Sequence, residues 1–583
     1  MRTPRRATSK KSVATIPPTH GRILIAGTMI VLFALGIVAR LMMLQIMNGA
    51  RYRALASEQH EVLQKLFPER GEILSLDRER RASPLATTTT THLVFADPSE
   101  IALKEEEMQA LASILTLPLQ EVQEKITDKE KRYVVLKKEV SADIVATLTE
   151  QQWKGIGTQT VPGRTYPEKS IGAHVLGFVG ETEQGLRGNY GLEEYFEELL
   201  RGRQGLLRQE QDNKGRPLML GDRQLYPAEG GATLTTTLDR SIEFFACNAL
   251  NEAVKRHSAT GGSVLILEPA TGKIIGLCSH PTFDPNQYRD VKDIAVFNNQ
   301  VIFGAWEPGS IFKTLTIASA LDAGKITPLT RYNDEGSIKM HEFTIRNADH
   351  KVYGMQTMTQ VLENSINTGA VFAQEQLGNE AFKTYVENFG MGQKTGIELP
   401  GEVEGTTSSL AKKGAIFAAT ASFGQGITAT PLQMALAYGV IANGGSLMKP
   451  YVVEEISIPG GEKISSNPRM IRRVISEGTA RMMRSMLQAV VERGHGKRAS
   501  VAGYSVGGKT GTSQVAKQHA KGYEEGKYIG SFVGFAPVEN PRFVMAVRID
   551  NPQDVIYAES TAAPLFGEIA KFLLQYLEVP KDK

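Results

Sequence analysis

The longest apolar stretch of the chain lies close to its first residue. Residues 23–39 contain no charged side chain, and beyond Arg40 the apolar character resumes up to residue 47. A helix of about 20 consecutive apolar residues is long enough to cross a bilayer. The pattern therefore predicts a single transmembrane anchor at residues 23–47. A cleaved signal peptide is the rival interpretation, but the stretch is long for one and no clean small-x-small cleavage site follows it.

The pattern beyond the anchor changes once along the chain. Between residues 48 and 235, short strand-like runs mix with charged, helix-like runs, and the turn-rich sequence at 227–231 then marks a junction. From residue 236 onward the pattern is more regular. Because 583 residues are too many for one ordinary core, we predict two domains beyond the anchor, at 48–235 and 236–583.

Two hairpins and several helices are predicted within residues 236–583. Apolar runs at 264–267 and 273–277 flank a short Pro/Gly turn, and runs at 529–535 and 543–549 flank another. Helices are expected at 311–323, 356–376, 431–442 and 564–577. Distant hairpins with helices between them favour one antiparallel sheet with helices on its faces. The expected fold class is multidomain α+β: a transmembrane helix, an elongated mixed α/β pedestal, and this sheet domain.

Charge is nearly balanced over the whole chain but one-sided next to the anchor. The net charge of +3 gives no case for nucleic-acid binding. Residues 1–22 carry six Lys or Arg residues and no acidic residue. A basic flank stays on the cytoplasmic side of a membrane helix. Residues 1–22 are therefore expected to form a basic cytoplasmic tail, with everything beyond the anchor outside the cytoplasm.

The cysteines and histidines do not indicate a metal site or a disulfide framework. Cys247 and Cys278 are the two cysteines, too few for a framework, and the ten histidines show no clustered ligand spacing. Cys247 lies in a helix-like run and Cys278 in a strand-like run, and we expect two buried free thiols. No metal site is predicted from these residues, so any chemistry must come from ordinary side chains.

Ser310 and Lys313 stand one turn apart at the start of a predicted helix. A serine hydroxyl is barely nucleophilic without a nearby base, and residues i and i+3 share one face of a helix. Burial, the helix N-terminus or a second cation would lower the pKa of the lysine enough for it to act as that base. Ser-x-x-Lys also occurs at 409–412 and 446–449, but only Ser310 follows a Pro-Gly helix start.

Two further motifs follow in the chain. Ser365-x-Asn367 interrupts an apolar run, which suggests that the pair faces a cleft. The glycines of Gly-Gly-Lys-Thr-Gly-Thr at 507–512 allow close backbone approach on a strand whose edge could receive a peptide. Each motif has a second copy, at 465–467 and at 394–396, both in turn-like or loop-like surroundings.

Ser-x-x-Lys, Ser-x-Asn and Lys-Thr-Gly in this order are the signature set of penicillin-binding proteins and serine β-lactamases. Residues 236–577 resemble the transpeptidase domain of class B penicillin-binding proteins, as supported by PTFDPNQY, SFGQGITATPLQ and SFVGFAPVENPR. Upstream, PERGEILSLDR and RTYPEKSIGAHVLGFVG resemble the non-catalytic, dimerisation-type pedestal of that family, although Glu79-Arg80 stands where the family often has an Asn-Gly turn. Within the class, the chain most resembles the division-specific, septal group.

The resemblance implies a role for each motif residue. The catalytic residues would be Ser310, Lys313, Ser365, Asn367 and Lys509, and the substrate-binding residues Thr510, Gly511 and Thr512. Ser310 would attack the penultimate D-alanine carbonyl of a peptidoglycan stem peptide while Lys313 takes its proton. Ser365 would pass a proton to the departing D-alanine. An amine from a neighbouring stem would then resolve the acyl-enzyme, and β-lactam antibiotics would acylate the same serine. The resemblance implies that no metal or organic cofactor is required.

The same resemblance implies partners and leaves alternatives open. It suggests a SEDS-family membrane glycosyltransferase and other divisome membrane proteins as partners, in the bacterial cytoplasmic (inner) membrane at the division site. An elongation-specific transpeptidase of the lateral wall and a mainly scaffolding divisome protein are the alternatives. A carboxypeptidase uses the same residues with water as the acceptor. A β-lactamase would not need the pedestal and anchor, and a β-lactam sensor would need a cytoplasmic signalling module.

Overall fold

The structure is a computed structural model that describes residues 18–47, 61–66, 68–182, 185–210, 223–340, 342–517 and 522–583. Most of the predicted cytoplasmic tail, residues 1–17, lies outside the described residues. The chain divides into two compact units. The smaller unit comprises Met1–Phe67 and Gln204–Ala228, and the larger comprises Pro68–Arg203 and Glu229–Lys583.

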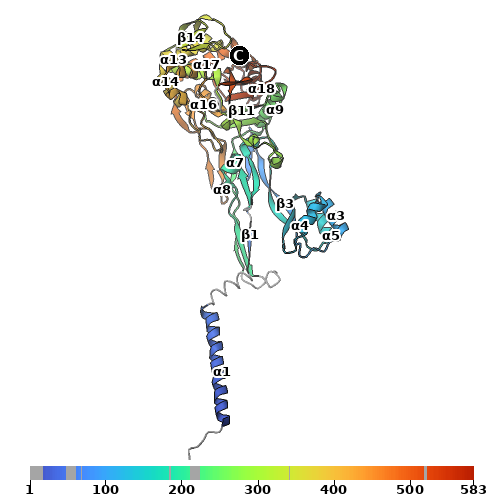
Figure 1. Cartoon of the computed structure of the whole chain (residues 1–583). Coiled ribbons are helices and arrows are strands. Elements are labelled where there is room, and N and C mark those ends of the chain that lie inside the picture. The colour runs from blue at the N-terminus through green and yellow to red at the C-terminus, as the bar shows by residue number, and fades with distance from the viewer. Residues whose placement is uncertain are drawn as a thin grey trace, which may run out of the picture. The chain divides into compact units, whose positions relative to one another are not determined.

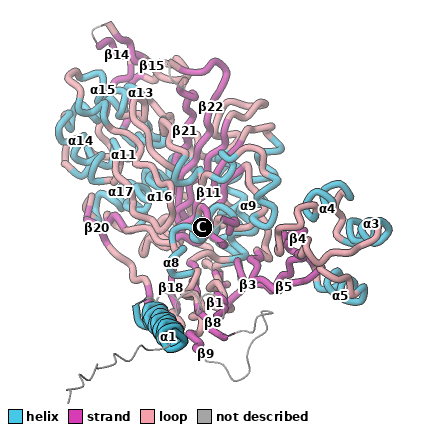
Figure 2. Tube along the Cα trace, turned by 60° about the horizontal axis from the view of Figure 1, so that its bottom comes forward, coloured by secondary structure: helices cyan, strands magenta, loops and turns pink. Residues whose placement is uncertain are grey.

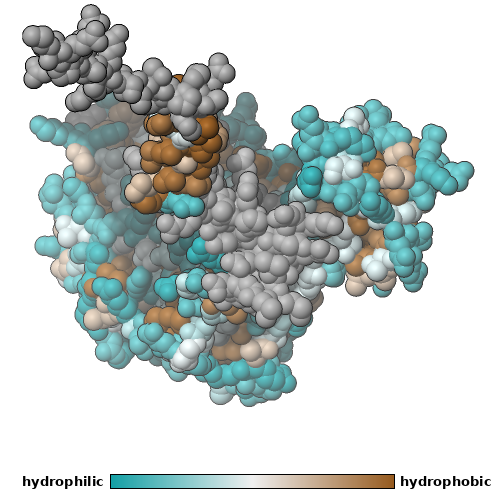
Figure 3. All heavy atoms as spheres, turned by 90° about the horizontal axis from the view of Figure 1, so that it is seen from below, coloured by the Kyte–Doolittle hydropathy of each residue, from teal (hydrophilic) through white to brown (hydrophobic). Residues whose placement is uncertain are grey.

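The smaller unit contains the predicted anchor. Helix α1 (Pro18–Met42) continues into a π-helical turn, η1 (Met43–Met47), and its surface is brown, the colour of apolar residues, in Figure 3. The span Ile23–Ile46 has a mean hydropathy of 2.3, and none of it is buried. At about 1.5 Å per residue, such a helix exceeds the hydrocarbon core of a bilayer. The prediction of one apolar helix of spanning length is confirmed.

The remaining described strands of the smaller unit form an antiparallel sheet in the order β1-β8-β9. These strands are β1 (Glu61–Leu66), β8 (Gly205–Glu210) and β9 (Arg223–Tyr226).

The first sheet of the larger unit combines strands from distant parts of the chain. Its order is β19-β18-β10-β2-β3-β4, and β5 also pairs with β3. The strands are β2 (Ile73–Leu76), β3 (Ala82–Ala96), β4 (Val134–Val140), β5 (Ile156–Thr165), β10 (Thr233–Thr236), β18 (Val453–Ser457) and β19 (Lys463–Ser465). Because β18 pairs with β10, residues far beyond the junction at 227–231 belong to the same sheet as the pedestal strands.

Short helices and one hairpin complete this part of the fold. Helices α3 (Glu105–Ile114), α4 (Leu119–Ile126) and α5 (Ala142–Gln151) share a small core with β3 and β4. The other elements are α6 (Ala173–Leu176), β6 (Phe178–Thr182), β7 (Gly185–Asn189), α7 (Gly191–Tyr195) and α8 (Glu197–Leu200).

The second large sheet is antiparallel and has five strands, in the order β12-β11-β23-β22-β21. Its strand β11 is labelled in Figure 1, and β21 and β22 are labelled as well in Figure 2. The strands are β11 (Gly261–Leu267), β12 (Ile274–His280), β21 (Gly507–Ala516), β22 (Tyr523–Ala536) and β23 (Phe543–Asp550). Helices α9 (Arg240–Arg256) and α18 (Ala562–Tyr576) share one apolar core with this sheet. A second core joins the sheet to α11 (Lys313–Asp322), α16 (Pro431–Ala442) and α17 (Glu477–Glu492).

Shorter elements connect these layers. The helical ones are η2 (Pro285–Asp290), η3 (Ile294–Phe297), α10 (Gln300–Phe303), η4 (Gly309–Phe312), α12 (Met358–Glu363), α13 (Asn367–Leu377), α14 (Asn379–Asn388), η5 (Ser408–Ala411), α15 (Ala415–Ala421) and η6 (Lys497–Ala499). The strands are β13 (Arg331–Asp334), β14 (Ser337–Met340), β15 (Phe343–Arg346), β16 (Gly354–Thr357), β17 (Ser446–Met448) and β20 (Met470–Arg473).

Most secondary-structure predictions for this domain are confirmed. The two hairpins correspond to β11–β12 and β22–β23, and both lie in the predicted antiparallel sheet with helices on its faces. The one helix expected at 356–376 is wrong, because the segment forms two helices, α12 and α13, that are interrupted at Ser365. The apolar pattern runs through the break because both helices are buried, and it therefore gives no sign of it.

The prediction of two free thiols is also wrong. Cys247 of α9 and Cys278 of β12 form a disulfide, with their Cα atoms 5.3 Å apart. Helix α9 packs against β12, so residues 31 positions apart in sequence become neighbours in space. Two cysteines are too few for a framework, but they are enough for one bridge when the fold brings their Cα atoms within the usual range.

A buried ion-pair cluster joins three elements of the pedestal. The Glu193 carboxylate of α7, fully buried, accepts hydrogen bonds from Arg70 Nε (2.6 Å), Arg164 Nε (2.7 Å) and the Tyr166 hydroxyl (3.2 Å). Arg70 also donates to Glu197 (2.7 Å). Although burial opposes ionisation, the two guanidinium groups hold the pKa of Glu193 below its ordinary value. Two carboxylates, Glu193 and Glu197, thus balance the charges of the two guanidinium groups, and Glu193 contacts both of them.

Replacing Glu193 should be strongly destabilising. In Glu193→Ala, Arg164 and Arg70 lose a buried partner, and we expect the free energy of unfolding to fall by roughly 3–5 kcal/mol. The nearby Glu198→Ala removes a carboxylate that pairs with Arg201 in an exposed ion pair, and it should have little effect. Thermal unfolding of both variants tests this, and equal transition midpoints would show that the cluster does not stabilise the pedestal.

Candidate active site

Ser310 lies in η4, the helical turn that leads into α11. Gly309 before it has a positive φ of 58°, and its N–H donates to the Gly424 carbonyl (3.1 Å). A Cβ at Gly424 would lie 2.3 Å from the Gly309 carbonyl oxygen, so neither glycine can be replaced without moving backbone. Ser310 is half-buried, whereas Ile311 beyond it is fully buried. The predicted Pro-Gly helix start is confirmed, and it presents the serine on a firmly packed turn.

Two lysine side chains converge on one hydroxyl. Lys313 Nζ donates hydrogen bonds to the Ser365 carbonyl oxygen and to Ser365 Oγ, the latter over 3.2 Å. Lys509 Nζ reaches the same Oγ over 3.0 Å, and it also contacts the Thr510 carbonyl oxygen (3.2 Å). Both lysines are fully buried. Residues from three distant segments, α11, the α12–α13 junction and β21, are therefore joined in one network.

The position of Ser365 depends on the break between α12 and α13. Its φ is +55°, a left-handed conformation that is uncommon for a residue other than glycine. The N–H groups of Ser365 and Ile366 still donate to carbonyls of α12, at Leu362 (3.3 Å) and Val361 (3.0 Å) respectively. Backbone in this region is typical of functional sites, where surrounding structure holds it in place. Here it directs both the carbonyl and the hydroxyl of Ser365 toward Lys313.

Burial lowers the pKa of both lysines. The pKa of Lys313 lies well below its ordinary value, first because burial disfavours the ammonium form and second because Lys509 is nearby. Burial lowers the pKa of Lys509 to about 7. Two ammonium groups in one buried site repel each other and lack solvation. The neutral amine of Lys313 is thereby populated at moderate pH, as a general base requires.

Strand β21 carries the Lys-Thr-Gly motif at an edge of the five-stranded sheet, next to η4. A Cβ at Gly511 would lie 2.9 Å from the Pro308 carbonyl oxygen, and one at Gly309 would lie 3.2 Å from the Thr512 carbonyl oxygen. The glycines thus allow β21 to run close beside η4, the turn that carries Ser310 (here called the serine turn). The Thr512 hydroxyl accepts a hydrogen bond from the Ala558 N–H (3.1 Å), while Thr510 is within reach of Lys509.

Asn367 is positioned by a buried polar cluster. Its Nδ2 donates to the Arg346 carbonyl oxygen (2.8 Å), and its backbone N–H donates to Asn347 Oδ1 (3.1 Å). Asn347 Nδ2 in turn donates to Asp334 Oδ2 (2.9 Å), and Thr368 Oγ1 donates to Asp334 Oδ1 (2.6 Å). Asp334 and Asn347 are both almost completely buried. The cluster fixes the first turn of α13, and with it the residue that begins that helix.

The structure thus brings the predicted site residues into one region. Ser310 and Lys313 lie on η4 and α11, Ser365 and Asn367 flank the start of α13, and Lys509–Thr512 lie on β21 beside them. The rival Ser-x-x-Lys copies lie elsewhere: Ser409 is buried in η5 and Ser446 begins β17. Context, rather than the motif itself, distinguishes Ser310.

Sequence reasoning missed several residues around the site. Asp334 and Asn347 lie in no motif, and their separation along the chain gives no signal of contact. Glu307, next to the serine motif, accepts hydrogen bonds from the Gly426 N–H (2.9 Å) and the Tyr523 hydroxyl (2.8 Å). The only signal in the sequence that Glu307 lies near the site is its position three residues before Ser310.

One group of side chains among the described residues could hold a metal ion, and it lies outside this site. It comprises Glu243, Cys247 and Cys278, whose ligand atoms lie within 4.8 Å of one another. Because the two sulfurs are joined in a disulfide, neither is a thiolate that could coordinate a metal.

A serine at a helix start, a buried lysine one turn later and a second lysine on a sheet edge define a serine acyltransferase of the penicillin-recognising type. Comparison with known proteins agrees with this class. Residues 262–571 match the penicillin-binding protein transpeptidase domain, and residues 65–236 match the penicillin-binding protein dimerisation domain. This chain belongs to the class B penicillin-binding proteins.

Relatives and a solved structure extend over nearly the whole chain. The stage V sporulation protein D of Bacillus subtilis is 34% identical over 551 residues, which cover 93% of this chain and 84% of that protein. The peptidoglycan D,D-transpeptidase FtsI of Buchnera aphidicola is 28% identical, with 98% of each chain covered. The crystal structure of penicillin-binding protein 3 from Mycobacterium tuberculosis, complexed with aztreonam, has a TM-score of 0.68 and 27% identity, covering 89% of this chain and 98% of that one.

Family membership and α1 together define where the enzyme works. The chain has the plan of a single-pass membrane protein whose catalytic domain lies outside the cytoplasm.

The lysine pair predicts a pH dependence. Acylation of Ser310 by a penicillin should accelerate as pH rises, because only the neutral amine of Lys313 can accept a proton, and it should level off well below the ordinary pKa of lysine. In Lys509→Met the nearby positive charge is removed, so the half-maximal pH should shift upward. Exposed Lys497→Met is the control. A half-maximal pH that stays the same or falls in Lys509→Met would exclude Lys313 as the titrating base.

Proposed function

We propose that this chain cross-links peptidoglycan stem peptides in septal wall synthesis, through an acyl-enzyme formed on Ser310. The observation that carries the proposal is the Ser365 hydroxyl, which lies within hydrogen-bond distance of both Lys313 Nζ and Lys509 Nζ. Such an arrangement connects a base for the attacking serine with a proton donor for the leaving amine. Both are needed for acyl transfer from a peptide.

Acylation begins with the donor stem peptide beside β21. Ser310 Oγ attacks the carbonyl carbon of the penultimate D-alanine, and the neutral amine of Lys313 takes the hydroxyl proton. Backbone N–H groups of Ser310 and Thr512 stabilise the oxyanion; that of Ser310 lies in the first turn of a helix, where N–H groups have no intrahelical acceptor. Collapse of the tetrahedral intermediate requires a proton on the departing D-alanine amine, and Ser365 passes it on from the lysine pair.

Substrate is held along the motif residues. Thr510 and Thr512 bind the terminal carboxylate, Gly511 lets the strand approach the serine turn, and Lys509 supplies positive potential when protonated. Asn367 uses one N–H on the Arg346 carbonyl oxygen, so its Oδ1 is left to orient a substrate amide. An amine from a neighbouring stem then attacks the acyl-enzyme in the reverse sequence. A β-lactam follows the first half of this path, and the mycobacterial relative forms a complex with one, aztreonam.

The names of the relatives support the septal role, and the matched domains support the partners. Several carry the names FtsI or PenA and are described as peptidoglycan D,D-transpeptidases. The matched domains are a dimerisation and a transpeptidase domain, neither of which polymerises glycan. We therefore propose a SEDS-family glycosyltransferase and other divisome membrane proteins as partners at the division site.

Labelling with a fluorescent penicillin tests the nucleophile. The full-length chain should carry the label on a peptide containing Ser310, and Ser310→Ala should carry none. Ser409→Ala and Ser446→Ala, which alter the rival motif copies, should label as the unaltered chain does. Supplying a stem-peptide donor with and without an acceptor amine separates transfer from hydrolysis. Label on another serine, or hydrolysis that no acceptor diverts, would contradict the proposal.

Depletion of the protein in growing cells tests the septal role. Loss of septal cross-linking should leave elongation intact, so the cells should grow into undivided filaments. Re-expression of the unaltered chain should restore division, whereas Ser310→Ala should not if the role is catalytic. Rounded cells would assign the protein to lateral-wall synthesis, and rescue by Ser310→Ala would indicate a scaffold.

A further inference from the structure

The disulfide between Cys247 and Cys278 lies away from the catalytic strand. It joins α9 to β12, which is one edge of the five-stranded sheet, whereas the catalytic strand β21 is the opposite edge. Nothing in the proposed acyl transfer uses it. Its surroundings nevertheless contain features that a purely structural bridge does not require.

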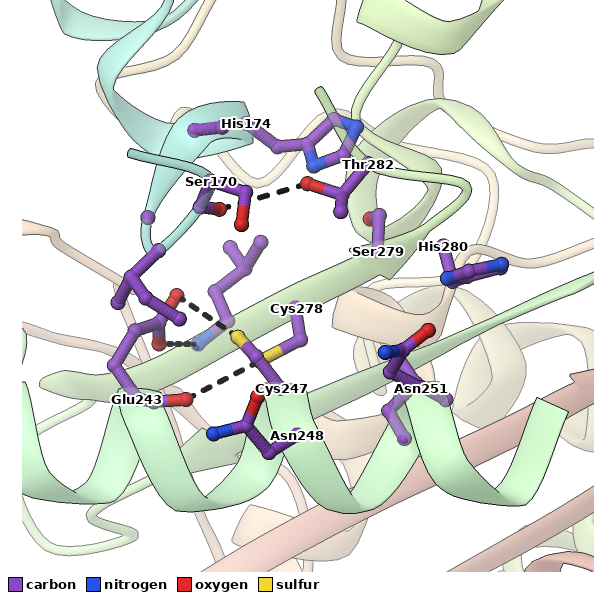
Figure 4. Close-up of a pocket in the computed structure, with 15 residues that line it drawn as sticks. Ser170, His174, Glu243, Cys247, Asn248, Asn251, Cys278, Ser279, His280 and Thr282 are labelled. Carbon is purple, nitrogen blue, oxygen red and sulfur yellow. Dashed lines mark hydrogen bonds between the residues drawn. A yellow bond between two sulfur atoms is a disulfide. The ribbon is translucent and has the colours of Figure 1, made fainter. Parts of the chain in front are cut away.

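The first feature is a cavity of about 60 Å³ beside the bridge, large enough to hold water. Both cysteines and Glu243 line it, and Ser170 and Thr282 lie on its far side (Figure 4). Cys247 is partly exposed, whereas Cys278 is almost completely buried. Of the two cysteines, Cys247 is therefore the more accessible to a reagent from solvent.

The second feature is the Glu243 carboxyl group, which is almost completely buried next to the bridge. Its Oε2 accepts a hydrogen bond from the Leu277 N–H (2.7 Å), and its Oε1 lies 3.6 Å from Cys247 Sγ. A disulfide sulfur carries no hydrogen, so any hydrogen between these two atoms must belong to the carboxyl group. Among the described residues no other side chain donates to this oxygen. The geometry is that of a neutral carboxylic acid directed at a disulfide.

The electrostatics agree with this geometry. Burial raises the pKa of Glu243 to about 8, while the hydrogen bond from the Leu277 N–H acts in the opposite direction. The other titratable groups at the cavity are His174 of α6 and His280 of β12. Burial lowers the pKa of His174 to about 4 and also lowers that of His280, so both imidazoles are neutral at neutral pH. Glu243 is therefore the one group lining this cavity that holds an exchangeable acidic proton near pH 7.

We propose that Cys247–Cys278 is a thiol–disulfide exchange site, reduced by an extracytoplasmic dithiol protein, in which Glu243 is the proton donor to the departing cysteine. Disulfides persist outside the cytoplasm, so opening one there requires a dedicated thiol reductant. The reductant acts through a thiolate, which attacks one sulfur of the disulfide and expels the other.

The proposed exchange takes place in two steps. A thiolate of the reductant attacks Cys247 Sγ, the Cys247–Cys278 bond breaks, and a mixed disulfide forms on Cys247. Cys278 leaves as a thiolate and takes the proton of Glu243, whose carboxyl oxygen lies within 4.8 Å of its sulfur. The second thiol of the reductant then displaces Cys247, which leaves with that thiol's proton. The chain has gained two electrons and the reductant is oxidised to a disulfide, while Glu243 recovers its proton from water.

The role of Glu243 is tested by reduction rates in the full-length chain in detergent. Dithiothreitol is the reductant, a chelator excludes metal binding, and free thiols are counted by alkylation and mass spectrometry. At each pH, the reduction rate of the unaltered chain is divided by the rate of Glu243→Gln. The effect of pH on the ionisation of dithiothreitol is the same for both chains and therefore cancels. At about pH 6.5 the ratio should be roughly tenfold, and it should fall toward one by about pH 9 as Glu243 loses its proton.

Glu398→Gln is the matched control. Burial also raises the pKa of Glu398, and its carboxylate likewise accepts a backbone hydrogen bond, from the Val452 N–H (3.0 Å). It does not line the cavity at the disulfide, so its ratio should stay near one throughout. A ratio for Glu243→Gln that does not depend on pH, or that equals the control, would overturn the assignment of Glu243.

The site of attack is tested without any variant. Brief treatment of the unaltered chain with glutathione, followed by acid quenching and peptide mapping, should give a mixed disulfide on Cys247. An adduct confined to Cys278 would reverse the proposed direction of attack. A bridge that opens only after denaturation would show that the disulfide is purely structural.

Discussion

Two lysine amines buried around one hydroxyl impose the constraint on which the rest of the active site depends. Lys313 and Lys509 approach Ser365 from different elements, so α11, the α12–α13 junction and β21 must meet within hydrogen-bond distance. Burial makes the ammonium forms costly, and their proximity adds repulsion. The site therefore favours sharing a proton over holding two charges, which is the condition under which a lysine can activate a serine at neutral pH.

This constraint explains features that would otherwise look unrelated. Glycines at 309, 424 and 511 remove side chains where the serine turn, its neighbouring loop and the catalytic strand come within van der Waals distance. The left-handed conformation of Ser365 directs its polar atoms at Lys313, and the Asp334–Asn347 cluster holds the helix that follows. Local backbone preference is overridden here because the surrounding hydrogen bonds are satisfied only in this arrangement.

Short local motifs predicted the candidate site residues, whereas contacts between distant segments gave no signal in the sequence. Ser-x-x-Lys, Ser-x-Asn and Lys-Thr-Gly are short sequence motifs that can be read directly. The hairpins and helices follow from the periodicity of apolar residues. The break at Ser365 lies in a run that is apolar on both sides, so periodicity could not reveal it. The disulfide depends on α9 packing against β12. Asp334 ends β13 and Asn347 follows β15, and they meet where both strands contact α13. At Arg80, a non-glycine residue with φ of 60° replaces the expected Asn-Gly turn, and Asp77 stabilises that turn by accepting from Arg81.

The two edges of the five-stranded sheet meet opposite requirements. In the proposed acyl transfer the β21 edge receives a peptide, so a covering helix or a crosslink there would block it, and its glycines contribute little side-chain packing. Such an edge is a weak point of any sheet. Two other parts of the sheet compensate for this weak edge. Helices α9, α16 and α18 bury both faces of the strands behind β21. At the opposite edge, the disulfide fixes β12 to α9. A bridge at that distance can be opened without touching a catalytic residue, so its effect on the enzyme would have to pass through the packing of the sheet itself.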